Sequence, residues 1–270
     1  MINLVTNKQI AESSSKGNQE KWFQEEENRW YKLDLFGYEI LAETVISVLL
    51  EQTNIKELGF QTVRYQMETI QAHGKKRIGC SSENFLKPEE SLITLASLLK
   101  KGFGPDWQQK MRNFSIPRKI EWITKTVQDL TGLEHFGQYL TLLFEIDLLF
   151  VNDDRHLNNI AVLRQGETFS YCPLFDFGAG LLSNIRDYPL DTDIRMSLAQ
   201  AKSLPFDCSF VRQVHGVQSM YGPQLKIHFT SQDILDALEK SLSYYSKRDI
   251  PFLKDRIVDC IRIQRKKLGQ

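Results

Sequence analysis

The chain contains 270 residues, of which 41% are hydrophobic and 25% are charged, and this composition excludes a globally disordered or fibrous protein. Its 34 basic and 34 acidic residues leave no net charge, which argues against a general nucleic-acid coat or a basic membrane binder. The four cysteines form no CxxC pair, so we expect free thiols in a reducing cytoplasm. No secretory signal is recognisable, and the most apolar stretch, 140–151, is too short to span a bilayer.

The first third of the chain is predicted to form short strands around one helix. Two aromatic-rich runs, 21–24 and 29–33, flank a polar turn, a pattern typical of a β-hairpin. Apolar residues then recur every three or four positions over 38–52, which predicts an amphipathic helix. A further strand is predicted at 61–67, and the basic run at 73–77 is interpreted as a solvated turn.

The rest of the chain is predicted to be mostly helical. Periodic apolar patterns predict helices over 92–99, 120–130, 136–150, 231–245 and 251–267, with a strand at 160–163. A β-rich start followed by a helical remainder predicts an α+β fold of two lobes with a cleft between them. We expect a small β-rich N-lobe over residues 1–70 and a larger, mainly helical C-lobe over residues 71–270.

A polar segment after the apolar 136–150 helix carries the most specific chemical signal. It reads Asn-Asp-Asp-Arg-His-Leu-Asn-Asn over 152–159, and Asp176 follows in the sequence Phe-Asp-Phe-Gly. Phosphoryl transfer needs a carboxylate that orients the attacking hydroxyl and oxygen ligands that hold Mg²⁺. Asp154 and Asn159 have the Asp-x-x-x-x-Asn spacing of kinase catalytic loops, and Asp176 matches the metal-binding aspartate of a DFG element. The alternative interpretation is a polar loop followed by an unrelated acidic turn.

The phosphates of a nucleotide also need a cationic partner. Lys32 lies in a predicted strand, and Glu43 follows on the rim of the amphipathic helix. A strand lysine paired with a helix glutamate orients phosphates in kinases. Glu39, one turn earlier, competes for the glutamate role, and either residue could instead be a solvated surface charge. His156 is interpreted as a structural hydrogen-bonding residue, and Arg155 as the partner of a neighbouring acid or a phosphorylated residue.

Several motifs together resemble the HipA-type Ser/Thr kinases, which are the toxin kinases of bacterial toxin–antitoxin modules. The loop order Asp-Arg-His is also seen in phosphoinositide-kinase-like enzymes, and GxGxxG and VAIK motifs are absent. The stretch 14–21, Ser-Ser-Lys-Gly-Asn-Gln-Glu-Lys, resembles the Gly-x-Gln-x-Lys phosphate loop of the HipA type. The segment 77–86 and the short chain resemble the compact CtkA-related group of that family.

The resemblance implies a role for each matching position. Asp154 would be the catalytic base, Asn159 and Asp176 would bind Mg²⁺, and Lys32 would contact the ATP phosphates. The phosphate loop would use the four residues Gly17, Asn18, Gln19 and Lys21. Ser14 is similar in position to a loop serine that becomes phosphorylated in HipA-type kinases. Separate antitoxin-like regulation is also implied, and we expect no direct contact with nucleic acid.

Two other functions stay open at this point. The Asp-Arg-His order suggests a kinase of a lipid or another small molecule, although the one dense basic run, 262–267, is typical of a helix end. A nucleotide-binding regulatory module without turnover is the second alternative, but all the polar residues expected for catalysis are present. The adenine-contacting hinge is expected within 66–86, at Gln66–Ile70 for preference. The physiological substrate is not encoded in these spacings.

Overall fold

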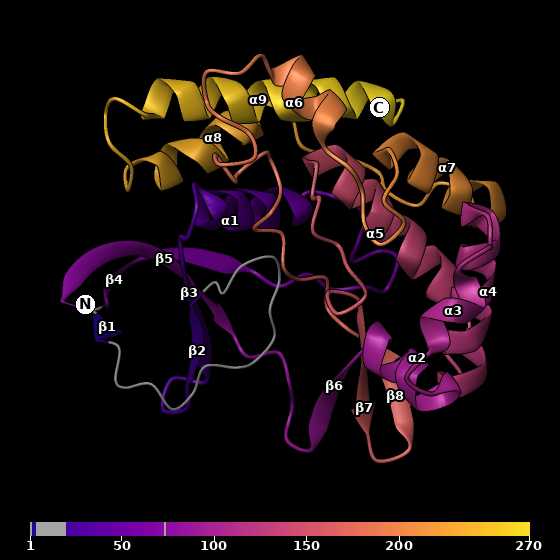
Figure 1. Ribbon diagram of the computed structural model, residues 1–270. Helices are drawn as coiled ribbons and strands as arrows, with labels where there is room; N and C mark the ends of the chain where they lie inside the picture. Colours follow the sequence, from indigo (N-terminus) through magenta and orange to yellow (C-terminus); the bar gives the residue numbers. More distant parts are fainter. Residues whose placement is uncertain (1, 4–19, 73) are drawn as a thin grey trace.

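The computed structural model describes residues 2–3, 20–72 and 74–270, which form two lobes (Figure 1). The N-lobe contains a five-stranded sheet with the order β1-β4-β5-β3-β2. Its strands are β1 (Ile2–Asn3), β2 (Lys21–Gln24), β3 (Arg29–Leu33), β4 (Tyr65–Ala72) and β5 (Lys75–Glu83). The two aromatic runs form the predicted hairpin, β2–β3, in which Lys21 pairs with Lys32. Helix α1 (Glu39–Leu50) follows the hairpin and packs on β4 and β5.

The C-lobe combines a three-stranded sheet with most of the helices. The sheet has the order β6-β7-β8, formed by β6 (Glu90–Thr94), β7 (Ala161–Gln165) and β8 (Thr168–Tyr171). The helices are α2 (Leu95–Phe103), α3 (Trp107–Met111), α4 (Ile116–Thr131), α5 (Phe136–Phe150), α6 (Ile194–Gln200), α7 (Phe210–Tyr221), α8 (Ser231–Leu242) and α9 (Ile250–Lys267). The predicted α+β fold of two lobes is observed. None of the described helices is long and apolar enough to cross a membrane.

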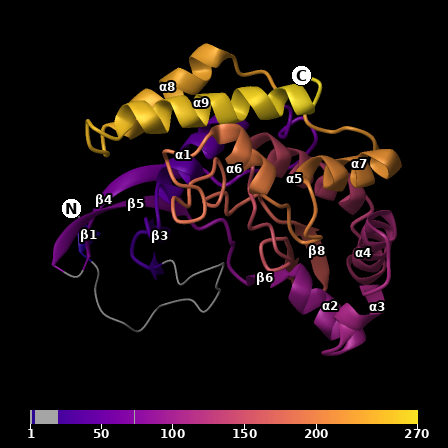
Figure 2. The same cartoon turned by 45° about the horizontal axis from the view of Figure 1, so that its top comes forward.

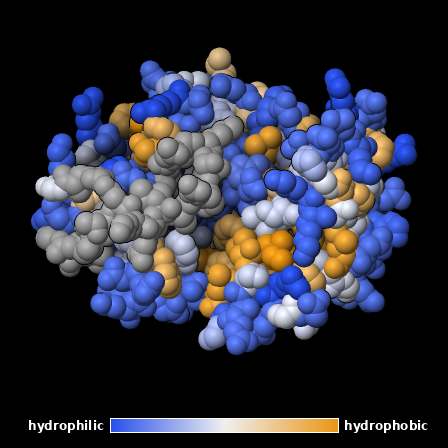
Figure 3. Space-filling model, turned by 60° about the horizontal axis from the view of Figure 1, so that its bottom comes forward, coloured by the Kyte–Doolittle hydropathy of each residue, from blue (hydrophilic) through white to orange (hydrophobic). Residues whose placement is uncertain are grey.

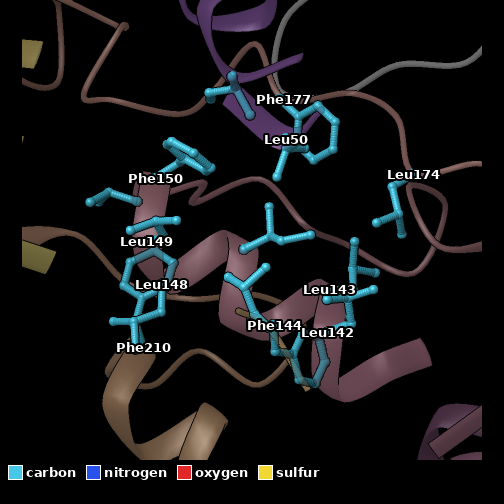
Figure 4. Packing of buried hydrophobic residues seen from close by; sticks show 14 of the residues in the cluster. Leu50, Leu142, Leu143, Phe144, Leu148, Leu149, Phe150, Leu174, Phe177 and Phe210 are labelled. Atoms are coloured by element: carbon cyan, nitrogen blue, oxygen red, sulfur yellow. The ribbon is translucent and has the colours of Figure 1, made fainter. Parts of the chain in front are cut away.

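Helix α5 lies at the centre of the main hydrophobic core. It begins and ends where the sequence predicted, and nearly every one of its residues is buried. Figure 4 shows leucine and phenylalanine side chains of α5 packed with residues from α1, α7 and the segment around Leu174 and Phe177. Burial on all sides explains the lack of a polar face in the sequence of α5. The catalytic-loop motif, which follows directly at 152–159, therefore starts from a rigid support.

The two C-terminal helices lie over α1, on the side away from the N-lobe sheet (Figure 2). Tyr245 Oη, beyond the end of α8, donates to Asp34 Oδ2 at 2.9 Å. Asp34 Oδ1 in turn accepts the N–H of Ile40 in the first turn of α1 at 2.8 Å. At the other end of α1, the N–H of His228 donates to the carbonyl of Gln52 at 3.0 Å. Helix α1 is thus held between the sheet and α8–α9.

Some sequence expectations differ from the observed elements. The boundary expected between residues 70 and 71 cuts through β4, which pairs with β5 to Ala72. The preferred hinge, Gln66–Ile70, lies inside the same strand, whereas residues 84–89 connect the two sheets. The helix predicted over 92–99 begins later, because the Thr94 hydroxyl accepts the N–H of Ser97 and caps α2 while the preceding residues form β6. The turn predicted at 73–77 includes the first residues of β5.

Candidate active site

Lys32, Glu43 and Asp176 form a contiguous charged cluster between the lobes. Tyr31 and Leu33 of β3 belong to a buried cluster on one face of the sheet, so the alternation of a strand directs Lys32 to the other face. Lys32 Nζ lies 3.0 Å from Glu43 Oε2 and 2.9 Å from Asp176 Oδ1. The three residues come from β3, α1 and the loop after β8, which are far apart in the sequence.

Glu43 also holds the backbone of the Phe-Asp-Phe-Gly segment. Its Oε1 accepts the N–H of Phe177 at 2.9 Å, and the side chain is fully buried rather than on the helix rim. The competing residue, Glu39, has a different task, because its carboxylate accepts backbone N–H groups of residues 35, 36 and 37 ahead of α1. The geometry therefore favours Glu43 as the partner of Lys32.

The charges in this cluster stabilise one another. Burial opposes the positive charge of Lys32, but Asp176 and Glu43 outweigh it and raise the pKa of Lys32 well above its ordinary value. Burial would raise the pKa of Asp176, but Lys32 and then Lys21 overcome it and hold that pKa far below its usual range. Lys21 itself is less well compensated: burial lowers its pKa despite the attraction of Asp176. Two lysines therefore flank an ionised aspartate.

The loop that contains Asp154 is closed by its own hydrogen bonds. The amide Nδ2 of Asn159 donates to the carbonyl of Asp154 at 3.0 Å, and the N–H of Asn158 donates to His156 Nδ1 at 3.2 Å. His156 Nε2 lies 3.9 Å from Asp154 Oδ2. The five-residue spacing of Asp154 and Asn159 thus corresponds to a single tight loop, in which His156 makes a structural hydrogen bond.

Arg155 ties this loop to the segment that carries Asp176. Its side chain is fully buried and donates three hydrogen bonds to the Asp147 carboxylate of α5, at 3.1 to 3.2 Å. Arg155 Nη1 donates to the carbonyls of Asn159 at 3.0 Å and Phe175 at 2.8 Å. The attraction of Asp147 outweighs burial and raises the pKa of Arg155, so the guanidinium stays charged. One buried cation therefore fixes both candidate magnesium-binding segments.

The described residues suit a magnesium ion held partly by nucleotide phosphates. Asp176 could contribute a carboxylate, and Asn159, whose amide nitrogen donates to the carbonyl of Asp154, could contribute the amide oxygen Oδ1. Oxygen ligands of this kind, few from the protein and the rest from phosphates and water, are what Mg²⁺ prefers. Among the described residues no group of three or more His, Cys, Asp or Glu could hold a metal by itself. The donor set thus fits a metal that arrives with a nucleotide.

Sequence reasoning missed two residues that support the cluster. The hydroxyl of Tyr65 in β4 accepts the N–H of Asp176 at 3.3 Å, and Lys32 Nζ lies 5.1 Å from the centre of the Tyr65 ring. Asp147 was visible in the sequence only as an acid inside an apolar helix, a costly arrangement that signals a buried partner. Of the expected phosphate loop, Lys21 is described, whereas Gly17, Asn18 and Gln19, like Ser14, lie outside the described residues.

Apolar side chains gather beside the charged cluster, where the two sheets meet. Phe85 and Leu86 from the connection between the sheets pack near Leu92 and Phe175, over the buried residues Ala161, Leu163 and Cys172. Figure 3 shows apolar side chains near the middle of the face seen from the side of β6–β8, surrounded by mostly hydrophilic surface. Ligand pockets commonly combine apolar walls with a few fixed polar groups, as this part of the molecule does.

The two lobes, with the charged cluster between them, have a kinase-like fold. No family model matches the sequence, and no curated protein matches it. Among solved structures, the proinflammatory kinase CtkA of Helicobacter pylori is similar over 95% of this chain and 93% of that chain, with a TM-score of 0.66 and 16% identity.

A second similar structure is the HipA, HipB and operator DNA complex of the Shewanella oneidensis MR-1 toxin–antitoxin system. The match covers 98% of this chain and 67% of that chain, with a TM-score of 0.52 and 14% identity. The protein therefore has the HipA/CtkA-like kinase fold, as the sequence motifs indicated.

Proposed function

We propose that the protein is an ATP- and Mg²⁺-dependent Ser/Thr protein kinase of the HipA-like type. The observation that carries the proposal is the cluster in which Lys32 contacts both Glu43 and Asp176. The same lysine, glutamate and aspartate arrangement positions ATP phosphates and metal in kinases. The nearby loop supplies Asp154 at the spacing that a catalytic base requires.

In this proposal each residue has a defined task. Asp154 orients the acceptor hydroxyl and takes its proton as the oxygen attacks the γ-phosphorus, and ADP leaves with the electrons of the broken bond. Asn159 and Asp176 would hold Mg²⁺, which neutralises charge on the phosphates when it is bound. Lys32 contacts the phosphates with the help of Lys21 and the sequence around Gly17. Glu43 keeps Lys32 in place, and Arg155 fixes the two loops relative to one another.

The acceptor in this proposal is a protein in the cytoplasm, and activity is regulated by an antitoxin-like partner. The similar HipA structure contains HipB, which supports a partner protein of this kind. The kinase interpretation competes with phosphorylation of a lipid or another small molecule and with nucleotide binding without turnover. The two kinase functions transfer phosphate to different acceptors, whereas nucleotide binding without turnover forms no product.

One labelling experiment separates these functions. The protein is incubated with γ-labelled ATP, Mg²⁺ and either dephosphorylated casein or vesicles that contain phosphatidylinositol. Label in phosphoserine or phosphothreonine of casein supports the proposal, label in lipid supports a lipid kinase, and nucleotide binding without any labelled product supports a regulatory module. Omission of Mg²⁺ should abolish transfer.

Asp154→Ala should reduce the rate of transfer by roughly 10²–10⁴-fold, because the positioned base is lost. Folding should survive, since Asp154, although buried, is a polar loop residue that belongs to none of the hydrophobic clusters. A matched control is Asp153→Asn, because Asp153 is the adjacent acid and accepts a hydrogen bond from Tyr188 at 2.6 Å. Near-normal turnover in the Asp154 variant would refute its role as the base.

We also propose autophosphorylation at Ser14, within the run Ser13 to Ser15 that precedes Gly17 in the sequence. A phosphate there would place about −1.5 to −2 charges next to the expected phosphate loop and lower the affinity for ATP by repulsion. Peptide mass spectrometry after incubation with Mg²⁺ and ATP tests this. Phosphate should appear within residues 13–15 of the wild type and be absent from Asp154→Ala. Equal phosphate in both proteins would identify another kinase as its source.

A further inference from the structure

A cavity of about 380 Å³ lies beside the catalytic loop and outside the charged cluster. Its walls come from α2, α3, α4, the loop at 156–158 and the segment 204–206. Figure 1 shows α2, α3 and α4 grouped at one end of the C-lobe, next to β6–β8. The volume falls within the range of about 300–1,000 Å³ that is usual for ligand pockets. The charged cluster for the nucleotide contributes no side chain to it.

The cavity lies close to the proposed catalytic base. His156 lines the cavity, and its Nε2 is 3.9 Å from Asp154 Oδ2. An extended peptide advances about 3.3 Å per residue. A substrate whose hydroxyl meets Asp154 would therefore bring a side chain only a few residues away into the cavity.

The lining has an apolar floor and a basic rim. Trp107 and Met111 are buried, and Phe206 of the 204–206 segment is partly buried, with Lys119 Nζ 6.0 Å from the centre of its ring. Arg112 and Lys119 provide the charged groups of the rim, and none of the described lining residues is acidic. Within the described part of the chain, neither cation takes part in an ion pair. An apolar side chain could pack against this floor, and a neighbouring carboxylate could interact with the two cations.

We propose that this cavity docks the protein substrate through a short segment that combines an apolar side chain with an acidic residue. The proposal deepens the kinase function and rests on it. Apolar burial supplies contact, and the two rim cations select against basic segments, because like charges brought together are disfavoured. Substrate selection would thus depend on residues next to the phosphorylated serine or threonine.

The test uses the full chain and a degenerate nonapeptide library with a central serine. Each other position is fixed in turn to Leu, Phe, Asp, Glu or Lys, and both phosphate transfer and capture of biotinylated peptide are measured. We expect wild type to prefer Leu or Phe together with Asp or Glu, each at one fixed distance from the serine. R112E/K119E should reduce the preference for acid roughly 10-fold and favour Lys instead.

A matched control reverses two cations that do not line the cavity. Lys110 lies in α3, which Arg112 follows directly, and Arg118 lies next to Lys119 in α4, so K110E/R118E changes the net charge equally and should keep the wild-type preference. Acid preference that is absent from wild type, or that persists in R112E/K119E, would overturn the docking pocket. Transfer without any pocket-dependent preference counts against this inference alone. Capture that follows the pocket, without transfer to any peptide, counts against the proposed function and supports the docking site.

Discussion

At the scale of single residues, the site depends on charges that are buried together. Lys32 lies between two carboxylates, and Arg155 lies against Asp147 with two backbone carbonyls completing its hydrogen bonds. Removing one member of such a group leaves the others buried without compensation, which costs more than the pair itself contributes. Residues in the group should therefore behave as a unit when they are changed.

A double-mutant cycle on Lys32 and Glu43 tests that unit. Lys32→Ala should lower the transfer rate by about 10²-fold or more, and Glu43→Gln should act similarly while it keeps an acceptor for the Phe177 N–H. The double variant should be little worse than either single variant, because each change already breaks the same contact. The control pair is Arg64 and Glu51, which lie 3.5 Å apart on the surface. Substitutions of Arg64 and Glu51 should have small and additive effects on the transfer rate. Additive effects of the substitutions at Lys32 and Glu43 would contradict the pairing.

At the scale of elements, α1 is fixed by a carboxyl group where β3 ends and the helix begins. Asp34 accepts hydrogen bonds from the N–H of Ile40 and from Tyr245, and so joins β3, α1 and the end of α8. Burial raises the pKa of the Asp34 carboxyl to about 7, and the Glu39 carboxylate adds to the rise. The junction therefore keeps a proton under conditions in which an exposed aspartate has lost it.

This raised pKa predicts a specific pH dependence of stability. Between about pH 4 and pH 7 the folded protein keeps a proton on Asp34 that the unfolded chain releases. The contribution of Asp34 to the free energy of unfolding is thus fully present below pH 4. It is lost as the pH rises through 7, and the total loss is about 4 kcal/mol. Asp34→Asn, which mimics the protonated form, should unfold in urea at higher concentration than wild type at pH 8, with the difference shrinking towards pH 4.

The control for this experiment has the opposite sign. Asp233 accepts hydrogen bonds from Thr230 at the start of α8, and these lower the pKa of Asp233. Asp233→Asn should therefore lower the free energy of unfolding at neutral pH, and the difference from wild type should shrink as the pH falls. If the free energies of unfolding of Asp34→Asn and wild type differ by the same amount at every pH from 4 to 8, the raised pKa of Asp34 is wrong.

Local patterns predicted the elements that depend on neighbours in the sequence. The β2–β3 hairpin, α5 and the Asp154 to Asn159 spacing could be read from adjacent residues. Strand β5 could not, because it begins with the basic residues 75–77 and continues with small polar residues that become buried between β3 and β4. The bonds of Arg155 to Phe175 and of Tyr245 to Asp34 join distant segments, and periodicity carries no information about such partners.

At the scale of the whole molecule, backbone hydrogen bonds attach the segment around Asp176 to the N-lobe side at two points. Leu174 exchanges backbone hydrogen bonds with Gln61 and Val63 at 2.8 and 2.9 Å. Further along, the N–H of Tyr38 donates to the carbonyl of Ser183 at 3.2 Å. The candidate metal-binding residue therefore lies between two points at which the segment is joined to the N-lobe side of the molecule.

Gly37→Ala should separate the lobes at this attachment. A Cβ at Gly37 would lie 2.0 Å from the backbone oxygen of Ser183, too close for the segment to keep its position. We expect the free energy of unfolding to fall by roughly 1–3 kcal/mol or more, with loss of phosphate transfer. Gly102→Ala is the control, because its Cβ would meet only the flexible end of Leu130 at 3.1 Å inside a helix. Equal stability of the two variants would show that the attachment contributes little.

The enclosure of α1 has a consequence for how such an enzyme can be turned on and off. A helix held by the sheet on one side and by α8–α9 on the other has Glu43 within reach of Lys32. Under the proposed function, the contact between Lys32 and Glu43 is already formed before each reaction cycle. Control would then fall on whether nucleotide and substrate can enter the cleft, so an effective inhibitor would be one that blocks entry rather than one that displaces a helix.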